Sequence, residues 1–203
     1  MWTFLIAGAL YGFAAGAQPG PFTAYLISLT LKQGFRRSLP AVFAPLISDS
    51  IIVAITMLVL FSVPPQLLRW LHLAGGVFVL YLAWGAWKSW RDYKDTSATE
   101  ISIGQSVIKA TLVNLFNPNP YLGWSLVLGP IVLRAWREAP RSGLAVVAGF
   151  YAALFGTTII VMLTMEFARA RGPQVTRALI AASAIVLAGM GVYQLWLGMV
   201  FRG

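Results

Sequence analysis

Residues 17–22 read AQPGPF and residues 116–121 read FNPNPY, and each stretch places two prolines one residue apart inside an apolar run. Proline has no amide hydrogen and clashes with the carbonyl four residues earlier, so each stretch leaves several carbonyls without helical partners. In hydrocarbon such groups persist only where protein or a water-filled cavity satisfies them. The two stretches therefore predict interrupted helices, and the rest of the fold is built outward from them.

The composition is that of an integral membrane protein. The 203 residues are 59% hydrophobic and only 10% charged, with a mean hydropathy of +0.76, whereas about a quarter of the residues in a soluble domain are charged. Abundant aromatic residues exclude a disordered chain. The absence of cysteine excludes disulfides, thiolate metal sites and cysteine nucleophiles.

Six windows are nearly free of charged side chains, and each is long enough to cross a bilayer. Crossing a hydrocarbon core of ~30 Å takes about 20 apolar residues. The windows are residues 1–31, 38–68, 70–87, 110–133, 142–165 and 178–201. They predict an all-α membrane protein with six transmembrane helices, of which helices 1 and 4 are broken at the Pro-x-Pro motifs.

A polar stretch divides the chain into two halves of three predicted helices. Residues 89–106 form the expected cytoplasmic linker, residues 1–88 the first repeat and residues 107–203 the second. An odd number of crossings per half makes the two repeats insert in opposite directions. Paired interruptions at corresponding places in inverted repeats are typical of a transporter binding site.

Basic residues fix the expected orientation. Most of the 15 lysine and arginine residues fall in loops on one side of the bundle, and positive loops stay cytoplasmic. They are Lys32, Arg36, Arg37, Lys88, Arg91, Lys94, Lys109, Arg169, Arg171 and Arg177. This predicts extracytoplasmic termini in a prokaryotic plasma membrane. Scattered loop charges suit lipid headgroups, so no nucleic-acid binding is expected despite the net charge of +9.

Asp49 is the acid expected within a membrane span. An aspartate at mid-membrane costs about 2.5–3.5 kcal/mol on insertion scales and marks a functional site facing the bundle interior. It suits proton coupling or the binding of an ammonium group. The alternative is a neutral structural aspartate that is hydrogen-bonded to another helix.

Past each break, the start of the next helix has backbone amides without helical partners, which can bind a carboxylate. The predicted substrate-binding or translocation residues are Gln18, Pro19, Gly20, Pro21, Asp49, Asn114, Asn117, Pro118, Asn119, Pro120 and Tyr121.

Glycine recurs every fourth residue along the first predicted helix, at Gly8, Gly12, Gly16 and Gly20. Ala145, Gly149 and Ala153 repeat the spacing in the fifth. Such stripes of small residues let helix backbones approach closely. They suit packing within one subunit or between two copies, which leaves a homodimer open.

The chain resembles the lysine exporter (LysE/RhtB) family. The resemblance rests on Pro19-Gly20-Pro21, Gly34 beside a basic turn, Asp49, the segment from Gly75 to Leu82, and Asn117-Pro118 after Gly104. It implies a six-helix exporter of amino acids and related metabolites driven by the proton gradient. The family commonly has Asn-Pro-Lys-Ala where this chain has Asn117-Pro118-Asn119-Pro120.

The function expected is therefore secondary active export of an amino acid or a small zwitterionic metabolite, coupled to protons and using alternating access. Two alternatives stay open, a divalent metal-ion exporter of the same superfamily and a structural membrane subunit. Hard cations want several oxygen ligands, and the spans offer one clear acid. No enzyme is expected, because the chain has one histidine and no recognisable hydrolase or metalloprotease motif. No cofactor or resident metal is predicted.

Overall fold

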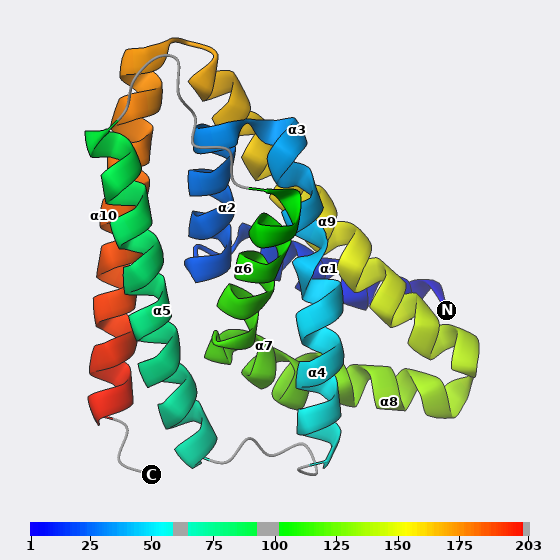
Figure 1. Cartoon of the computed structure of the whole chain (residues 1–203). Coiled ribbons are helices and arrows are strands. Elements are labelled where there is room, and N and C mark those ends of the chain that lie inside the picture. The colour runs from blue at the N-terminus through cyan, green and yellow to red at the C-terminus, as the bar shows by residue number, and fades with distance from the viewer. Residues whose placement is uncertain (59–64, 93–101, 201–203) are drawn as a thin grey trace.

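Proline marks the start of the longest helices. These are α5 (Pro65–Arg91), α9 (Pro140–Arg169) and α10 (Pro173–Val200). Proline suits the first helical position because its fixed φ is helical and an amide there would have no partner. The computed structural model describes residues 1–58, 65–92 and 102–200, and every regular element within those ranges is helical (Figure 1).

The other elements are shorter and several follow one another directly. They are α1 (Trp2–Ala17), α2 (Pro21–Gln33), α3 (Phe35–Ser38), the 3-10 helix η1 (Leu39–Phe43), α4 (Ala44–Leu58), α6 (Ile103–Leu115), α7 (Pro118–Gly123), the π-helical turn η2 (Trp124–Leu128) and α8 (Gly129–Glu138). The π-helical turn comes just before Pro130, which cannot donate to the Leu126 carbonyl. A single proline thus loosens the helix without ending it.

Four helices within the described ranges are long and apolar enough to span a membrane. They are Phe35–Thr56, Arg69–Arg91, Pro140–Arg169 and Pro173–Val200. The segments expected to hold the first and fourth crossings are divided, so α1 has 16 residues and α6 has 13. Neither reaches the ~20 residues that one crossing needs.

The linker predicted at residues 89–106 is shorter at both ends than the charge pattern indicated. Helix α5 continues through Arg91. Helix α6 already begins at Ile103, because the Ser102 side chain caps it by accepting the Gln105 amide at 3.2 Å. The central part of the predicted linker, residues 93–101, lies outside the described residues.

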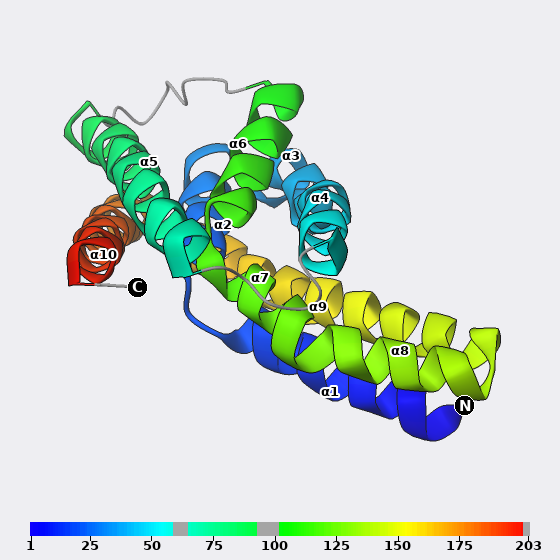
Figure 2. The same ribbon diagram turned by 90° about the horizontal axis from the view of Figure 1, so that it is seen from below.

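The helices fall into three neighbouring groups (Figures 1 and 2). Helices α5 and α10 run side by side in opposite directions. Helices α2, α4 and α6 stand in the middle, with α2 against α10 and α4 against α6. Helices α1 and α8 pack along α9 and extend to one side. Both breaks lie where the middle group meets this side arm.

Small residues let α1 and α9 touch backbone to backbone. A Cβ atom at Gly8 would lie 2.8 Å from the Val146 carbonyl carbon, and one at Gly12 would lie 2.9 Å from that of Phe150. From the other side, a Cβ atom at Gly149 would lie 3.1 Å from the Ala9 amide nitrogen. Carbon atoms attract best at about 3.5–4.0 Å, so none of these positions has room for a side chain.

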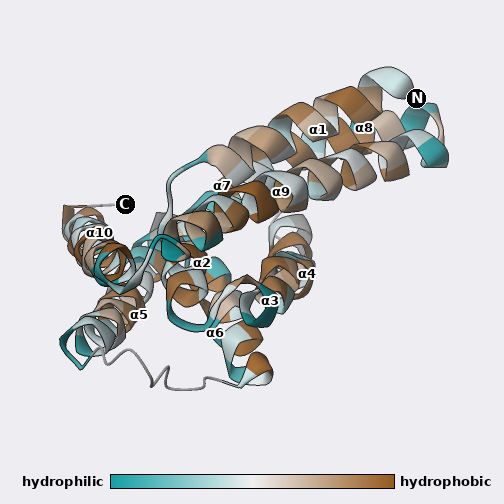
Figure 3. Cartoon of the chain, turned by 90° about the horizontal axis from the view of Figure 1, so that it is seen from above, coloured by the Kyte–Doolittle hydropathy of each residue, from teal (hydrophilic) through white to brown (hydrophobic). Residues whose placement is uncertain are grey.

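The outer faces of the helices carry large apolar side chains. Leu10, Trp84, Ile160 and Trp196 are each more than half exposed. Hydrophobic colour covers most of α1 and α9, while hydrophilic colour gathers at helix ends and turns (Figure 3). An apolar exterior is the arrangement that lipid requires, because acyl chains bond no polar groups.

Candidate functional site

The first break lies between α1 and α2. Helix α1 ends at Ala17, the backbone is extended at Gln18 and Gly20, and α2 begins at Pro21. The Gln18 amide still donates to the Ala14 carbonyl at 3.0 Å. The carbonyl of Gln18 accepts a bond from a side chain, the hydroxyl of Thr23, at 3.3 Å. A hydroxyl from the next helix therefore satisfies a carbonyl at the break.

The second break lies between α6 and α7 and is closed in a similar way. Helix α6 ends at Leu115 and α7 begins at Pro118. The Asn117 side-chain oxygen accepts the Asn119 amide at 3.1 Å and so caps α7. The Tyr121 hydroxyl donates to the Leu115 carbonyl at 3.0 Å. At both breaks a hydroxyl from the following helix reaches back to the last carbonyls of the preceding one.

Asp49 on α4 is held by buried hydrogen bonds beside the second break. It is 3% exposed. One carboxylate oxygen accepts the Asn114 amide at 3.0 Å, and the other accepts the Tyr151 hydroxyl at 3.1 Å. The same Asn114 nitrogen donates to the Ser48 hydroxyl at 2.8 Å, and the Trp124 side chain also bonds the carboxylate. Asp49 is thereby fixed by α6, η2 and α9, all from the second half of the chain.

A cavity of about 680 Å³, including solvent at its open side, lies against this carboxylate. Its lining comes from both breaks, from α4 and from the middle of α9. The lining residues are Tyr11, Ala15, Gln18, Gly20, Phe22, Thr23, Pro45, Asp49, Asn114, Asn117, Asn119, Pro120, Gly123, Trp124, Phe150 and Leu154. Among the described residues no three His, Cys, Asp or Glu side chains come together as a metal-binding group.

The family model for LysE type translocators matches residues 13–198, which include both breaks, Asp49 and most of the cavity wall. The chain belongs to the LysE family. Members of this family are membrane transporters, so the chain is a transporter and not an enzyme. None of the curated proteins or solved structures compared with the chain matches it.

The structure of this LysE-type translocator brings seven of the eleven predicted site residues to one cavity. They are Gln18, Gly20, Asp49, Asn114, Asn117, Asn119 and Pro120. The other four lie outside its lining. Pro21, Pro118 and Tyr121 are buried where the helices restart, and Pro19 is exposed. Their place in the fold is to shape the breaks.

The aromatic residues of the cavity wall were not predicted from the sequence. Tyr11 stacks on Phe150 with ring centroids 5.8 Å apart, and Trp124 meets Phe150 edge to face at 5.9 Å. Tyr11 has room because Gly123 opposite has no side chain: a Cβ atom there would strike the Tyr11 hydroxyl. The only available signal was a phenol hydroxyl at mid-span in Tyr11 and Tyr151, which needs a polar partner in hydrocarbon.

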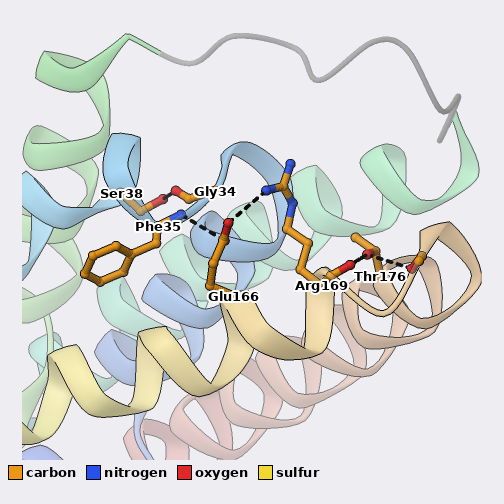
Figure 4. A network of polar contacts seen from close by, with 7 residues as sticks. Gly34, Phe35, Ser38, Glu166, Arg169 and Thr176 are labelled. Atoms are coloured by element: carbon orange, nitrogen blue, oxygen red, sulfur yellow. Dashed lines mark hydrogen bonds and ion pairs between the residues drawn. The ribbon is translucent and has the colours of Figure 1, made fainter.

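A second polar network of the LysE-type chain closes the far end of α2 (Figure 4). Glu166 on α9 accepts the Phe35 amide at 3.0 Å and the Arg169 guanidinium at 3.2 Å. Gly34 ends α2 with a φ of +85°, a conformation that favours glycine. Glu166 therefore caps α3 and ties the turn after α2 to the end of α9.

Lys32 lies in the same region, in the last turn of α2 and outside the predicted charge-free windows. Its ammonium group donates to the Gly85 carbonyl at 3.2 Å. Burial, together with repulsion from Lys109, lowers the pKa of Lys32 to about 8. The protonated and neutral forms of this amine therefore interchange close to neutral pH.

Proposed function

We propose that this LysE-family protein is a secondary active exporter of an amino acid or a small zwitterionic metabolite, driven by protons. In this proposal six crossings form two inverted three-helix repeats, with both termini outside the cytoplasm of a prokaryotic cell. The site consists of the eleven residues named from the sequence, with Asp49 as the proton-coupling group. Substrate and protons are the cargo, and the lipid bilayer is the surrounding medium.

The observation that carries the proposal is that Asp49 and the donors of its hydrogen bonds belong to different halves of the chain. Asp49 belongs to the first half, whereas Asn114, Trp124 and Tyr151 belong to the second. In alternating access one half rocks against the other around a fixed site. Such rocking changes which hydrogen-bond donors reach Asp49. A carboxylate that loses its donors in a site without water is stabilised by taking up a proton. Proton binding and conformation are then linked.

The cavity beside Asp49 supplies the substrate site in this scheme. It touches both breaks, where Asn117 and the start of α2 present N–H groups, and it has one carboxylate on its wall. A zwitterion needs both features, donors for its carboxylate and an acid for its ammonium group. The small-residue contact of α1 with α9 gives smooth faces along which helices can move with little loss of packing.

The test is transport by the purified protein in proteoliposomes. Flux of a panel of labelled amino acids is measured with and without an imposed pH gradient, for the unchanged chain, for Asp49→Asn and for Glu138→Gln. Glu138 is an exposed acid on α8 away from the cavity, so Glu138→Gln controls for the loss of one negative charge. We expect gradient-driven flux to disappear in Asp49→Asn and to persist in Glu138→Gln.

Two results would overturn the proposal. Gradient-driven flux that is unchanged in Asp49→Asn removes Asp49 from proton coupling. An absence of amino-acid flux, together with quenching of an entrapped metal-sensitive dye on addition of a divalent cation, favours a metal-ion exporter. Amino-acid exchange that persists at reduced affinity in Asp49→Asn, while the gradient no longer drives it, would support proton coupling by Asp49 together with its role in binding the ammonium group.

A further inference from the structure

The cavity wall carries a charge pattern that restricts the substrate further. Among its sixteen lining residues Asp49 is the one carboxylic acid, and the set includes no lysine, arginine or histidine. Four aromatic residues, Tyr11, Phe22, Trp124 and Phe150, belong to the same wall. The wall therefore provides one negative charge, several amides and a large apolar area.

We propose that the site selects amino acids with a single ammonium group and an aromatic or large aliphatic side chain, and rejects those with a charged side chain. This inference rests on the proposed function and names the substrate class of the same cavity. It follows from three features, namely the capacity of Asp49, the aromatic wall and the donors at the breaks.

Asp49 has capacity for one ammonium group. A carboxylate offers about four lone-pair positions, and the bonds from Asn114, Tyr151 and Trp124 occupy three of them. The position left over can accept the α-ammonium of a substrate. A second cation on the same substrate, as in lysine or arginine, would enter the cavity without a counter-charge, and desolvating an unpaired charge is costly.

The aromatic wall fits a flat or bulky apolar side chain. The Phe150 ring contacts the rings of Tyr11 and Trp124, at centroid distances of 5.8 and 5.9 Å. Their faces and edges supply apolar area and can also attract an ammonium group through cation–π contact. A side-chain carboxylate would find no cation on this wall and would be repelled by Asp49.

The α-carboxylate has donors at both breaks. Asn117 is 93% buried and lines the cavity. Its oxygen accepts the Asn119 amide, while its own NH2 group has no hydrogen-bond partner within the described part of the chain. Phe22 and Thr23 line the same cavity, and their amides, the first two of α2, have no acceptor within the helix. A side-chain amide without a protein partner, in the same cavity wall as the start of a helix, suits a carboxylate.

The experiment is competition for transport in proteoliposomes loaded with labelled phenylalanine for exchange. Competitors are leucine, phenylalanine, lysine and glutamate, together with phenethylamine, which lacks the carboxylate. We expect leucine and phenylalanine to compete at concentrations about tenfold or more below those of lysine, glutamate and phenethylamine, because each of these leaves one charged or polar group unpaired. Equal competition by lysine or glutamate would overturn the inference while leaving amino-acid export intact.

A glycine pair sharpens the test of the wall. In Gly123→Ala the added methyl group strikes the Tyr11 hydroxyl and pushes the ring toward the cavity, whereas in Gly189→Ala, on α10, it meets nothing within 4 Å. We expect Gly123→Ala to weaken competition by phenylalanine more than by alanine, and Tyr11→Phe in the same chain to restore it. Equal weakening for both competitors, or no rescue by Tyr11→Phe, would overturn the aromatic wall. Failure of every amino acid to exchange would instead remove the proposed function itself.

Discussion

The close contact of α1 with α9 makes a sharp prediction about glycine. In Gly8→Ala the new Cβ atom would sit 2.8 Å from the Val146 carbonyl carbon and overlap its oxygen. The first distance is about 0.7 Å shorter than the ~3.5 Å at which two carbon atoms attract best. Both partners are backbone atoms, so a rotamer change cannot relieve the clash, and the two helices must move apart.

The expected cost follows from two opposing effects. Overpacking a close interface costs about 1–3 kcal/mol. Replacing a mid-helix glycine by alanine returns about 0.5–1 kcal/mol through helix propensity. We therefore expect Gly8→Ala to lower the free energy of unfolding, by up to about 2.5 kcal/mol. Gly156 on α9 is the matched control, because a Cβ atom there meets nothing within 4 Å, so Gly156→Ala should stabilise the protein slightly.

The assay is unfolding in mixed micelles as the mole fraction of denaturing detergent rises, followed by circular dichroism and tryptophan fluorescence. Gly8→Ala should unfold at a lower detergent fraction than the unchanged protein, and Gly156→Ala at the same or a higher one. Equal midpoints for the two variants would refute the backbone contact between α1 and α9.

Three further outcomes are expected. Glu166→Ala leaves the Phe35 amide without its acceptor and should lower the free energy of unfolding by about 1–3 kcal/mol in the same assay. Glu166→Gln should lower it less, because an acceptor oxygen remains. A larger loss of stability in Glu166→Gln would contradict the capping role. Tyr151→Phe removes a donor to Asp49 and should shift the pH at which gradient-driven transport is half-maximal, with folding intact by fluorescence. Lys32, with its pKa lowered to about 8, loses its proton as pH rises through 8, so its acetylation, followed by mass spectrometry, should accelerate there and not near the usual ~10.4.

The features that the sequence could predict are those in which a residue destabilises its own helix or membrane span unless the fold compensates for it. Two prolines one residue apart cannot both lie in the interior of a regular helix, so the gaps after Ala17 and after Leu115 follow from covalent structure. An aspartate between long apolar runs must find polar partners inside the protein, and Asp49 has them. Neither inference needs knowledge of which helix lies nearby.

The features that could not be predicted depend on which helix faces which. Trp124 is 7% exposed and Trp196 is 52% exposed, yet both stand in apolar helical sequence. Lipid and protein interior are equally apolar, so hydrophobic pattern does not separate an aromatic residue of the cavity from one that faces acyl chains. The wall formed by Tyr11, Trp124 and Phe150 was missed for this reason.

The division of the fourth predicted span into α6, α7, η2 and α8 was missed in part for a different reason. Charge-free residues 110–133 were interpreted as one crossing broken once. Past the break, the chain instead passes from α7 through a π-helical turn ahead of Pro130 and continues as α8, which carries Arg134 and Arg137. A charge count detects the length of an apolar window but not a change of helix type within it.

The two breaks support one last prediction, because each depends on a single hydroxyl. The Tyr121 hydroxyl donates to the Leu115 carbonyl at 3.0 Å, and the Thr23 hydroxyl donates to the Gln18 carbonyl at 3.3 Å. Tyr121→Phe and Thr23→Val keep nearly the same shape and remove only the donor. A carbonyl left unpaired away from water costs about 1–3 kcal/mol.

The two variants should differ because their carbonyls differ in access to water. Tyr121 is buried, whereas Thr23 borders the open cavity, where water can replace its hydroxyl. We therefore expect Tyr121→Phe to lose most of that free energy in detergent unfolding and Thr23→Val to lose little. Equal losses would mean that the first break is as dry as the second, and a cavity closed to water at Gln18 could not deliver a polar substrate to Asp49.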